Sequence, residues 1–558
     1  MFRHLSVTFP FITRAGPTMW QQLYDPLGNA NLSALLAALP VVFFLLALTV
    51  LRLKGLTAAS LAVLVSVAVS SLVFGMPMGS IVGAALLGIA NGIFPIGFIV
   101  LMAVWLYKLS IRSGKFEVIR GSIATVSEDQ RIQVLLIAFC FGGFLEGAAG
   151  FGVPIAICAA LLVELGFRPL KAAMLCLLAN GAAGAYGAIG IPVLVGAQQG
   201  GVQLDEMSLM LMALVQVCAV FVPAGLVAML DGWRGVRETW PVLLFVGVVF
   251  SGVQTLTLYL LGPELVDILG PLAGMGGLAL FMRFWRPKRI YREAQAPPCS
   301  TQRWTLKQVL LAWSPFYILT GAILVWSLPA FKALFAADGA LAATVLHLPI
   351  GLLDQRVQEV PPLVASVRTL PAVWNVGWLN ASGTAILIAA VLTVLLSPRL
   401  NLRSASGELA QSAREMWKPL ATVSLVMAVA YVTNYSGASS SIGLALAQAG
   451  GVFPLLSPVI GWMGVFITGS VVNSNTLFAH LQAVTAAQIG VPAALLVAAN
   501  TAGGVMAKLV SPQSIAIAAA AVKLVGQESA IMRTTLVASL GLLAYVCLCT
   551  WLLSMVLQ

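Results

Sequence analysis

A single carboxylate stands in the middle of a long apolar stretch. Glu146 lies in the small-residue sequence G-G-F-L-E-G-A-A-G-F-G-V-P at 142–154 and is the only acid between Asp129 and Glu164. A charge at membrane depth costs roughly 2.5–3.5 kcal/mol on insertion scales, and glycines weaken a helix. This combination indicates a functional site, so we expect Glu146 either to exchange a proton or to form a permanent ion pair, with Gly147 at the binding surface. A carboxylate that merely reaches water is the alternative.

A second polar cluster carries no charge. The sequence T-G-S-V-V-N-S-N-T occupies 468–476, again inside an apolar stretch. Its hydroxyl and amide groups can bind a carboxylate or a hydroxyl, and the backbone N–H groups at half-helix ends favour an anion. We therefore expect binding contacts from Ser470, Asn473, Ser474 and Asn475. The alternative is that these side chains cap a turn.

The spacing Asn-x11-Pro occurs twice, from Asn180 to Pro192 and from Asn500 to Pro512, each time among Gly and Ala residues. Glycine and proline in the middle of a membrane span predict a broken helix whose free backbone groups face a site. An ordinary proline kink with close helix packing is the alternative for either segment alone. The recurrence favours the broken helix, and we expect both asparagines at the site.

Lys508 lies eight residues after Asn500. It is expected to pair with a substrate carboxylate or with Glu146, and the alternative is a lysine that snorkels to the membrane interface. Ser511 and Gln513 follow closely and are expected to satisfy backbone groups freed by the break, next to a bound substrate.

The elements that position these residues are membrane spans. The chain of 558 residues is 60% hydrophobic and only 9% charged, against about 25% charged residues in a soluble domain. This composition predicts an all-α polytopic membrane protein. Apolar stretches long enough to cross the hydrocarbon core predict about twelve spans, at 32–51, 56–74, 80–107, 171–197, 207–230, 241–261, 264–284, 307–328, 379–397, 418–434, 491–522 and 531–557.

Two further apolar blocks, at 132–165 and 452–489, are too long for one span and too short for two. Both are interrupted at the middle, which predicts re-entrant hairpins buried in protein. Each precedes a broken helix, at 171–197 or 491–522. We expect two inverted-topology repeats of a transporter. The predicted organisation is a poorly ordered extension (1–18), repeat 1 (19–230), linker spans with a basic cytoplasmic loop (231–306) and repeat 2 (307–558).

Basic residues cluster in the short loops between apolar stretches, which the positive-inside rule places in the cytoplasm. The formal net charge of +11 therefore indicates topology and no nucleic-acid partner. The first hairpin is then expected to enter from the cytoplasm, and the second from outside together with the 330–378 loop. Three histidines and seven cysteines without paired spacing predict no metal site. Since no phosphate-binding G-x-x-x-x-G-K-[ST] sequence is present, the energy source is expected to be a gradient.

Six sequences resemble a known family almost throughout the chain from Trp20 onward. They are W-Q-Q-L-Y-D-P at 20–26, F-L-E-G-A-A-G-F-G at 144–152, D-G-W-R-G at 231–235, S-G-T-A-I-L at 382–387, N-Y-S-G at 434–437 and S-P-Q-S-I-A-I-A at 511–518. On these residues the chain resembles the bacterial lactate permeases, carriers that couple L-lactate, D-lactate or glycolate to protons. The S-N-T sequence at 474–476 is also similar to the hairpin tips of a wider ion-transporter group.

Two positions depart from the family pattern. Val471 stands where the second hairpin of the family carries an acid, and the sequence from Asn180 reads N-G-A-A-G-A-Y-G in place of N-T-A-P-V-A-F-G. The resemblance leaves open the substrate and the proton stoichiometry. With that acid absent, Glu146 is the main candidate for proton coupling.

The resemblance implies a multi-pass protein of the bacterial inner membrane that carries a small 2-hydroxymonocarboxylate, lactate or glycolate, together with a proton. The expected partners are this anion, the proton and membrane lipid, with no cofactor; a homodimer is left open. A sodium-coupled carrier is the nearer alternative. An integral-membrane enzyme or a passive channel are alternatives from other classes, although the sequence holds no nucleophile–base or metal cluster for an enzyme.

Overall fold

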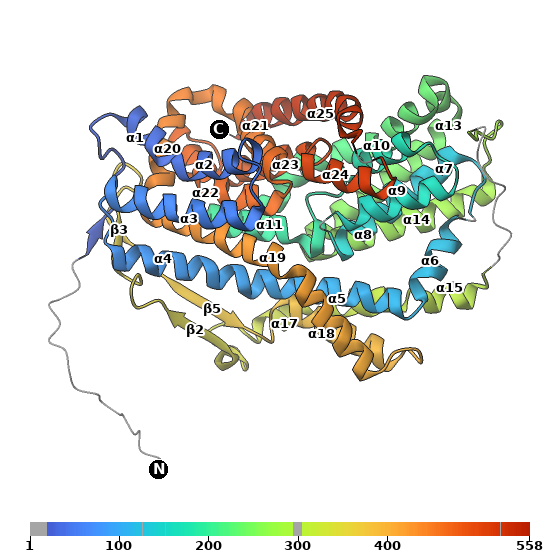
Figure 1. Ribbon diagram of the computed structural model, residues 1–558, viewed down its shortest axis with the longest axis horizontal. Coiled ribbons are helices and arrows are strands. Elements are labelled where there is room, and N and C mark those ends of the chain that lie inside the picture. The colour runs from blue at the N-terminus through green and yellow to red at the C-terminus, as the bar shows by residue number, and fades with distance from the viewer. Residues whose placement is uncertain (1–18, 125, 151, 294–303, 525, 558) are drawn as a thin grey trace, which may run out of the picture.

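Long helices dominate the chain, and most of them run along the long axis of the molecule (Figure 1). The computed structural model describes residues 19–557 except 125, 151, 294–303 and 525, so the expectation for the extension at 1–18 lies outside the described residues. The helices from the start of the described chain to residue 284 are α1 (Ala30–Ala37), α2 (Leu39–Thr49), α3 (Gly55–Leu72), α4 (Met78–Asn91), α5 (Phe98–Arg112), α6 (Lys115–Ala124), α7 (Gln130–Val134), α8 (Gly142–Ala148), α9 (Val153–Glu164), α10 (Pro169–Asn180), α11 (Gly187–Gly200), α12 (Leu204–Leu211), α13 (Val217–Leu261) and α14 (Val266–Phe284).

The helices of the later part of the chain are α15 (Leu306–Ala312), α16 (Ser314–Ser327), α17 (Pro329–Ala333), α18 (Ser382–Leu395), α19 (Leu402–Tyr435), α20 (Ala438–Leu446), α21 (Phe453–Thr468), α22 (Val471–Ile489), α23 (Ala493–Ala507), α24 (Pro512–Ala521) and α25 (Glu528–Leu557). Wider turns connect α7 to α8 over Leu135–Phe141 and α12 to α13 over Met212–Gln216, so each of these pairs forms one continuous helical segment. α4 and α5 are joined over Gly92–Gly97 by a kink at Phe94, whose backbone is not helical. A short turn at Pro263–Leu265 leads into α14.

Five short strands form two small sheets at one side of the molecule. The strands are β1 (Trp20–Gln21), β2 (Val345–Pro349), β3 (Val357–Glu359), β4 (Arg368–Thr369) and β5 (Val373–Gly377). β3 pairs in parallel with β1 and antiparallel with β4, and β2 pairs antiparallel with β5 from Val345 opposite Gly377 to Pro349 opposite Val373. Gln22 donates from Nε2 to the carbonyls of Asn434 (3.0 Å) and Tyr435 (2.9 Å), which joins the start of the described chain to the end of α19.

The structure supports a mostly helical chain with many apolar helices, and the exact count of about twelve spans stays a prediction. Among the described residues nine helices are long and apolar enough to cross a membrane, or up to eleven if two bent pairs each count as one span. The expected spans 207–230 and 241–261 belong to one segment, Leu204–Leu261, which Gly232 interrupts at φ 67. The short halves of the 171–197 segment fall below the length of a span.

Both predicted hairpins are pairs of packed helices joined by a glycine-containing turn. The first runs from Gln130 to Ala148, turns, and returns as α9. The second consists of α21 and α22 around Gly469, whose φ of 68 provides the left-handed turn. The first arm is buried along its whole length, as expected for a segment enclosed by protein. Its re-entrant placement in a membrane stays a prediction.

Both predicted broken helices are interrupted, but not at equivalent positions. In the first, α10 ends at Asn180 and the chain resumes as α11, with Ala188, Ile189 and Gly190 all at positive φ. Left-handed backbone at a β-branched residue is strained and is typical of functional sites. In the second, α23 continues for seven residues beyond Asn500 before it breaks. The equal Asn-x11-Pro spacing therefore does not produce equal breaks, since α10 ends at Asn180 whereas α23 runs on through Gly503 and Gly504 to Ala507.

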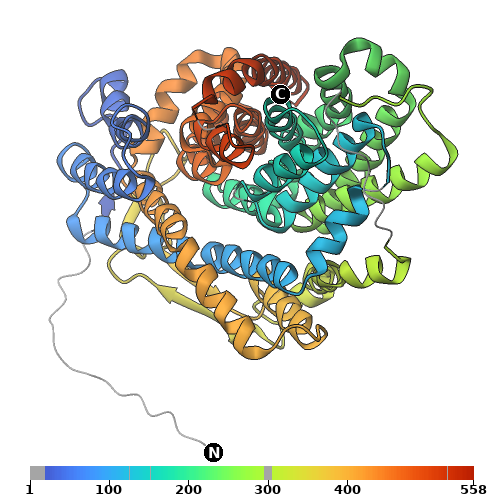
Figure 2. The same cartoon turned by 45° about the vertical axis from the view of Figure 1, so that its right-hand side comes forward.

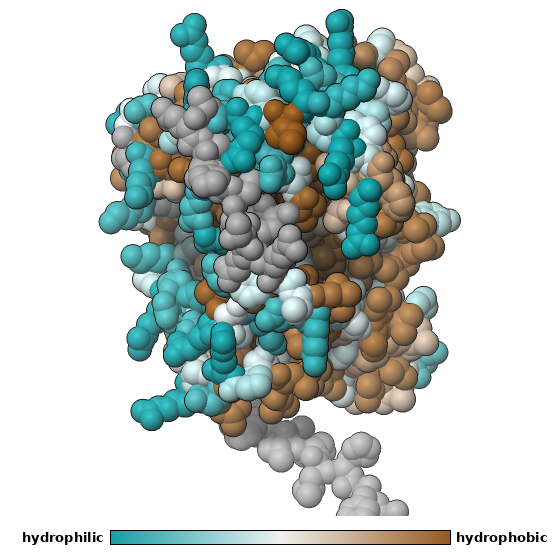
Figure 3. Space-filling model, turned by 90° about the vertical axis from the view of Figure 1, so that its right-hand side faces the viewer, coloured by the Kyte–Doolittle hydropathy of each residue, from teal (hydrophilic) through white to brown (hydrophobic). Residues whose placement is uncertain are grey.

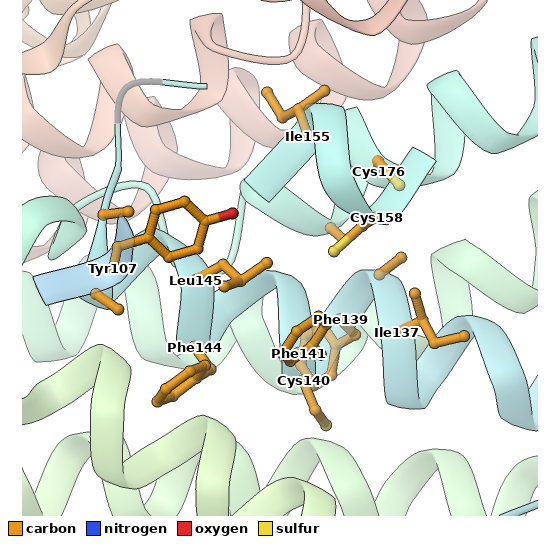
Figure 4. Close-up of a cluster of buried hydrophobic side chains, with 14 of the residues drawn as sticks. Tyr107, Ile137, Phe139, Cys140, Phe141, Phe144, Leu145, Ile155, Cys158 and Cys176 are labelled. Atoms are coloured by element: carbon orange, nitrogen blue, oxygen red, sulfur yellow. The ribbon is translucent and has the colours of Figure 1, made fainter. Parts of the chain in front are cut away.

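Apolar side chains pack behind the first hairpin. Figure 4 shows Phe139, Cys140 and Phe141 on one arm, below Cys158 on the other. The ring of Phe139 packs at a tilt against the ring of Phe250 of α13, with centroids 4.3 Å apart. The six cysteines among the described residues are free thiols. The hairpin is thus held as part of a core that includes α13.

A buried ionic cluster fixes the base of this hairpin. The guanidinium of Arg131, which is 0% exposed, contacts Asp129 at 2.7 Å, Glu238 at 2.7 Å and Asp231 at 3.1 Å. Arg289 contacts the same two residues of α13. Buried charges persist only when paired and hydrogen-bonded. Hydrophilic side chains gather at the end of the molecule that carries α7 and α15 (Figure 3).

α3, α4 and α5 run beside α19 in a layer of their own (Figure 2).

The backbones of α21 and α23 approach each other closely where the two helices cross at glycines. A Cβ on Gly461 would overlap the carbonyl oxygen of Asn500, and one on Gly503 would overlap that of Pro458. Small residues let membrane helices approach in this way.

We expect Gly461→Ala to lower the free energy of unfolding by about 1–3 kcal/mol, because the added methyl group forces two backbones apart. Gly541→Ala in α25 is the matched control, since a Cβ there meets nothing within 4 Å. Thermal unfolding in detergent measures both variants. Equal melting temperatures would contradict the close crossing.

Candidate functional site

Both hairpin turns and both helix breaks line one cavity of about 630 Å³. The first hairpin contributes Glu146, and the second contributes its tip from Ile467 to Asn473. The first break contributes Gly184 to Pro192, and the second contributes Lys508 and Gln513. The prediction that these four segments share a site therefore agrees with the geometry of the cavity.

The central contact of the cavity is an ion pair between its two halves. Lys508 Nζ lies 2.7 Å from Glu146 Oε1, and the side chains are 11% and 2% exposed. Asn180 donates from Nδ2 to the other carboxylate oxygen, Oε2, at 2.8 Å. Of the alternatives open for Glu146, this structure holds the ion pair.

Two glycines make room for Glu146. A Cβ on Gly187, at the start of α11, would overlap the Glu146 carboxylate. A Cβ on Gly147 would come within 2.6 Å of the Cβ of Asp267 on α14. Gly147 was expected at the binding surface, but it is not among the residues that line the cavity. It instead allows α8 to lie directly on the backbone of α14.

The second hairpin tip presents one unpaired amide. Ser470 caps α22, its hydroxyl accepting from the backbone N–H of Asn473 at 3.3 Å. Asn473 lines the cavity and is 7% exposed, and its side-chain oxygen has no hydrogen-bond partner. A Cβ on Gly469 would overlap the side chain of Gln513, so this tip rests on α24. Ser470, Asn473 and Gln513 all lie at the cavity, as expected.

The remaining expected residues lie behind the cavity and hold helices together. Asn475 donates to the carbonyl of Pro192 at 2.8 Å and accepts from Asn500 at 2.9 Å. Ser474 donates to the carbonyl of Gly461 at 3.2 Å. Ser511 caps α24 by accepting from the backbone N–H of Ser514 at 3.2 Å. These residues support the walls and do not line the cavity.

The opposite wall was not expected from the sequence. It is built from α2, α3 and α19, here called the scaffold wall, and carries Lys54 and Lys418, both exposed. The lining thus holds three cationic side chains and one acid, Glu146. α3, α9, α22 and α24 also begin at the cavity, and helix N-termini carry a partial positive charge. The electrostatics of this cavity fit a small anion.

Sequence reasoning also missed Asp267. This residue is 1% exposed and accepts from Gln254 Nε2 at 2.7 Å through Oδ1, while Oδ2 has no partner. The sequence does contain a pattern that indicates Asp267, because Glu264 and Asp267 interrupt an apolar stretch just as Glu146 does. In the part of the chain that the structure describes, no group of three or more His, Cys, Asp or Glu residues could hold a metal ion.

Comparisons with known proteins agree with these features. The family described as L-lactate permease matches residues 33–557. An L-lactate permease of Escherichia coli (strain K12) is 46% identical over 528 residues, which cover 94% of this chain and 96% of that protein. The L-lactate permease of Halalkalibacterium halodurans is 46% identical over 540 residues, covering 96% of this chain and all of that protein. Glycolate permease GlcA of Escherichia coli (strain K12) is 44% identical over 536 residues, with 93% and 95% covered. With its cavity, its apolar helices and these relatives, the chain belongs to the L-lactate permease family.

Proposed function

We propose that this chain carries a small 2-hydroxymonocarboxylate, L-lactate or glycolate, across the membrane together with one proton. Membership of a permease family makes it a multi-pass transporter of the bacterial inner membrane and not an enzyme. Its relatives are named as L-lactate and glycolate permeases. The observation that carries the proposal is the Glu146–Lys508 ion pair inside a cavity formed by both hairpins and both breaks.

Substrate recognition follows from the groups at the cavity. The substrate carboxylate binds Lys508, whose ammonium already holds a carboxylate at 2.7 Å. The N-termini of α22 and α24 add favourable dipoles. The 2-hydroxyl donates to the side-chain oxygen of Asn473, which has no other partner. A substrate without that hydroxyl leaves this buried oxygen unpaired, which costs about 1–3 kcal/mol.

Charge balance couples the proton to the substrate. In the empty carrier, Glu146 and Lys508 neutralise each other. When the substrate carboxylate takes Lys508, Glu146 becomes a buried carboxylate without a cation. An uncompensated buried charge is strongly unfavourable, so Glu146 takes up a proton. The loaded carrier is then neutral again, and both the empty and the loaded forms can change conformation.

The exposed lysines of the cavity lining support an inward-facing form. Lys54 and Lys418 both belong to segments that the positive-inside rule places at the cytoplasm. This form of the carrier therefore faces inward. Alternating access moves the two hairpins and the two broken helices against the scaffold wall. Ala188, the first residue of the strained backbone at Ala188–Gly190, lines the cavity between these two parts.

We expect Glu146→Gln to abolish uphill transport while lactate exchange continues. Glutamine resembles the protonated acid, so Lys508 stays available but no proton is carried. In proteoliposomes with an inward gradient of one pH unit, coupled transport accumulates lactate about tenfold, since one pH unit corresponds to about 1.4 kcal/mol. The variant should reach a ratio of about one.

Glu206→Gln is the control, because Glu206 is an exposed acid in the first turn of α12. Counterflow of labelled lactate shows whether each variant still binds and exchanges substrate. If Glu146→Gln still accumulates lactate and alkalinises the medium, Glu146 is not the coupling group. Uptake with and without a sodium gradient tests the sodium-coupled alternative in the same vesicles.

A second prediction concerns the cation. Lys508→Gln leaves Glu146 buried without its partner, which should lower stability by about 3–5 kcal/mol. The double variant Glu146→Gln, Lys508→Gln removes both charges, so thermal unfolding should return toward wild type while lactate uptake stays lost. A single variant as stable as wild type, or a double variant that binds lactate normally, would contradict the role given to this pair.

A further inference from the structure

A second cavity lies where the short turn before α14 meets α16, α17 and the start of α18. Its volume is about 240 Å³, and it is lined by Glu264, Trp326, Lys332, Asn380 and other residues of α16 to α18. These lining segments directly precede and follow the strand-bearing part of the chain. Glu264 is the acid among its lining residues, and it lies within electrostatic range of Lys332.

Asp267, in the first turn of α14, follows by three residues Glu264 of the short turn Pro263–Leu265. Residues at this spacing lie on the same face of a helix, about 5–6 Å apart at Cβ. Asp267 is buried, and Gln254 holds one of its oxygens while the other has no partner. Gly270 leaves the space that Gln254 occupies, since a Cβ there would overlap the glutamine side chain.

Asp267 is equally close to the first cavity. Gly147, next to Glu146, allows α8 to touch the backbone and Cβ of Asp267. Charged and titratable groups of the neighbouring segments that interact electrostatically with Asp267 include Glu146, Lys508 and Tyr186. A third carboxyl thus lies between the Glu146–Lys508 pair and the second cavity, and the transport cycle described above does not use it.

We propose that Glu264, Asp267 and Glu146 form a carboxyl relay that brings the transported proton to Glu146 by a path separate from the substrate cavity. The proposal rests on the proton symport proposed above. Each step moves one proton from a carboxylic acid to a neighbouring carboxylate, so charge is conserved and no other reactant is needed. The partnerless oxygen of Asp267 receives and releases the proton, and Gln254 fixes its orientation through the other oxygen.

The arrangement also provides a gate. Glu264 and Asp267 belong to the segment that packs on the first hairpin, whereas the residues facing Glu264 belong to α16, α17 and α18. Movement of the hairpin unit against those helices would open or close the second cavity. In the empty carrier Glu146 is ion-paired with Lys508. The relay therefore delivers a proton to Glu146 only after the substrate carboxylate has replaced Glu146 as the partner of Lys508.

The test compares Asp267→Asn and Glu264→Gln with wild type in proteoliposomes. A pH dye records proton movement during lactate uptake, and labelled lactate records counterflow. We expect Asp267→Asn to lose at least about tenfold of the initial rate of proton-driven uptake, since a positioned proton-transfer group contributes about 10²–10⁴-fold. Counterflow should stay within about twofold of wild type, because Glu146 keeps its proton while one substrate molecule replaces another and no proton has to pass Asp267. Asp205→Asn, an exposed acid in α12, is the control.

Asparagine preserves the shape of a protonated acid, so a merely structural role predicts normal proton-driven uptake in Asp267→Asn, and that result would overturn the relay. If Asp267→Asn does not fold, Glu264→Gln decides: Glu264 is only partly buried, and unchanged proton-driven uptake in this variant would overturn the proposal. If wild type moves no protons with lactate, the proposed symport itself fails. If wild type and both variants all move protons with lactate, the relay is overturned and the proposed symport stands.

Discussion

The contact between Glu146 and Lys508 joins residues that are 362 positions apart. It forms only when the first hairpin and the second broken helix pack around the same space. A buried charge without its partner is strongly destabilising, so this pair constrains both halves of the chain. Removal of either charge, or binding of a competing anion, changes the charge balance of the whole cavity. The proposed coupling of substrate and proton follows from this constraint.

Close approach of helices makes the pair possible. Gly187 leaves the space for the Glu146 carboxylate, and Gly147 brings α8 against Asp267. In the other half, Gly461 and Gly503 bring α21 and α23 into backbone contact. Glycine lowers helix stability. Here the close helix contacts, which no larger residue at these positions would allow, offset that loss. The family sequence around Glu146 is therefore explained by packing as much as by chemistry.

Much of the fold could be predicted from the sequence. Apolar length and glycine interruptions located both hairpins and both broken helices, since these features depend on local composition. Hydropathy also divided the segment Leu204–Leu261 into two predicted spans, and the structure has a kink between them at Gly232. The position of each break was also not determined by the Asn-x11-Pro spacing. Helix breaks depend on which neighbours satisfy the freed backbone, and spacing does not contain that information.

The sequence by itself determined that a membrane protein with acidic, basic and amide groups at interrupted helices binds a small polar ligand. It identified Glu146 and Lys508 because isolated charges in apolar stretches are costly. Only the tertiary structure decided that these two side chains meet, that Asn475 and Asn500 bond to each other behind the cavity, and that Asp267 lies beside the first hairpin. The physical reason is that the free-energy cost of a charged residue in an apolar stretch follows from the local sequence, whereas its partner is determined by packing between distant segments.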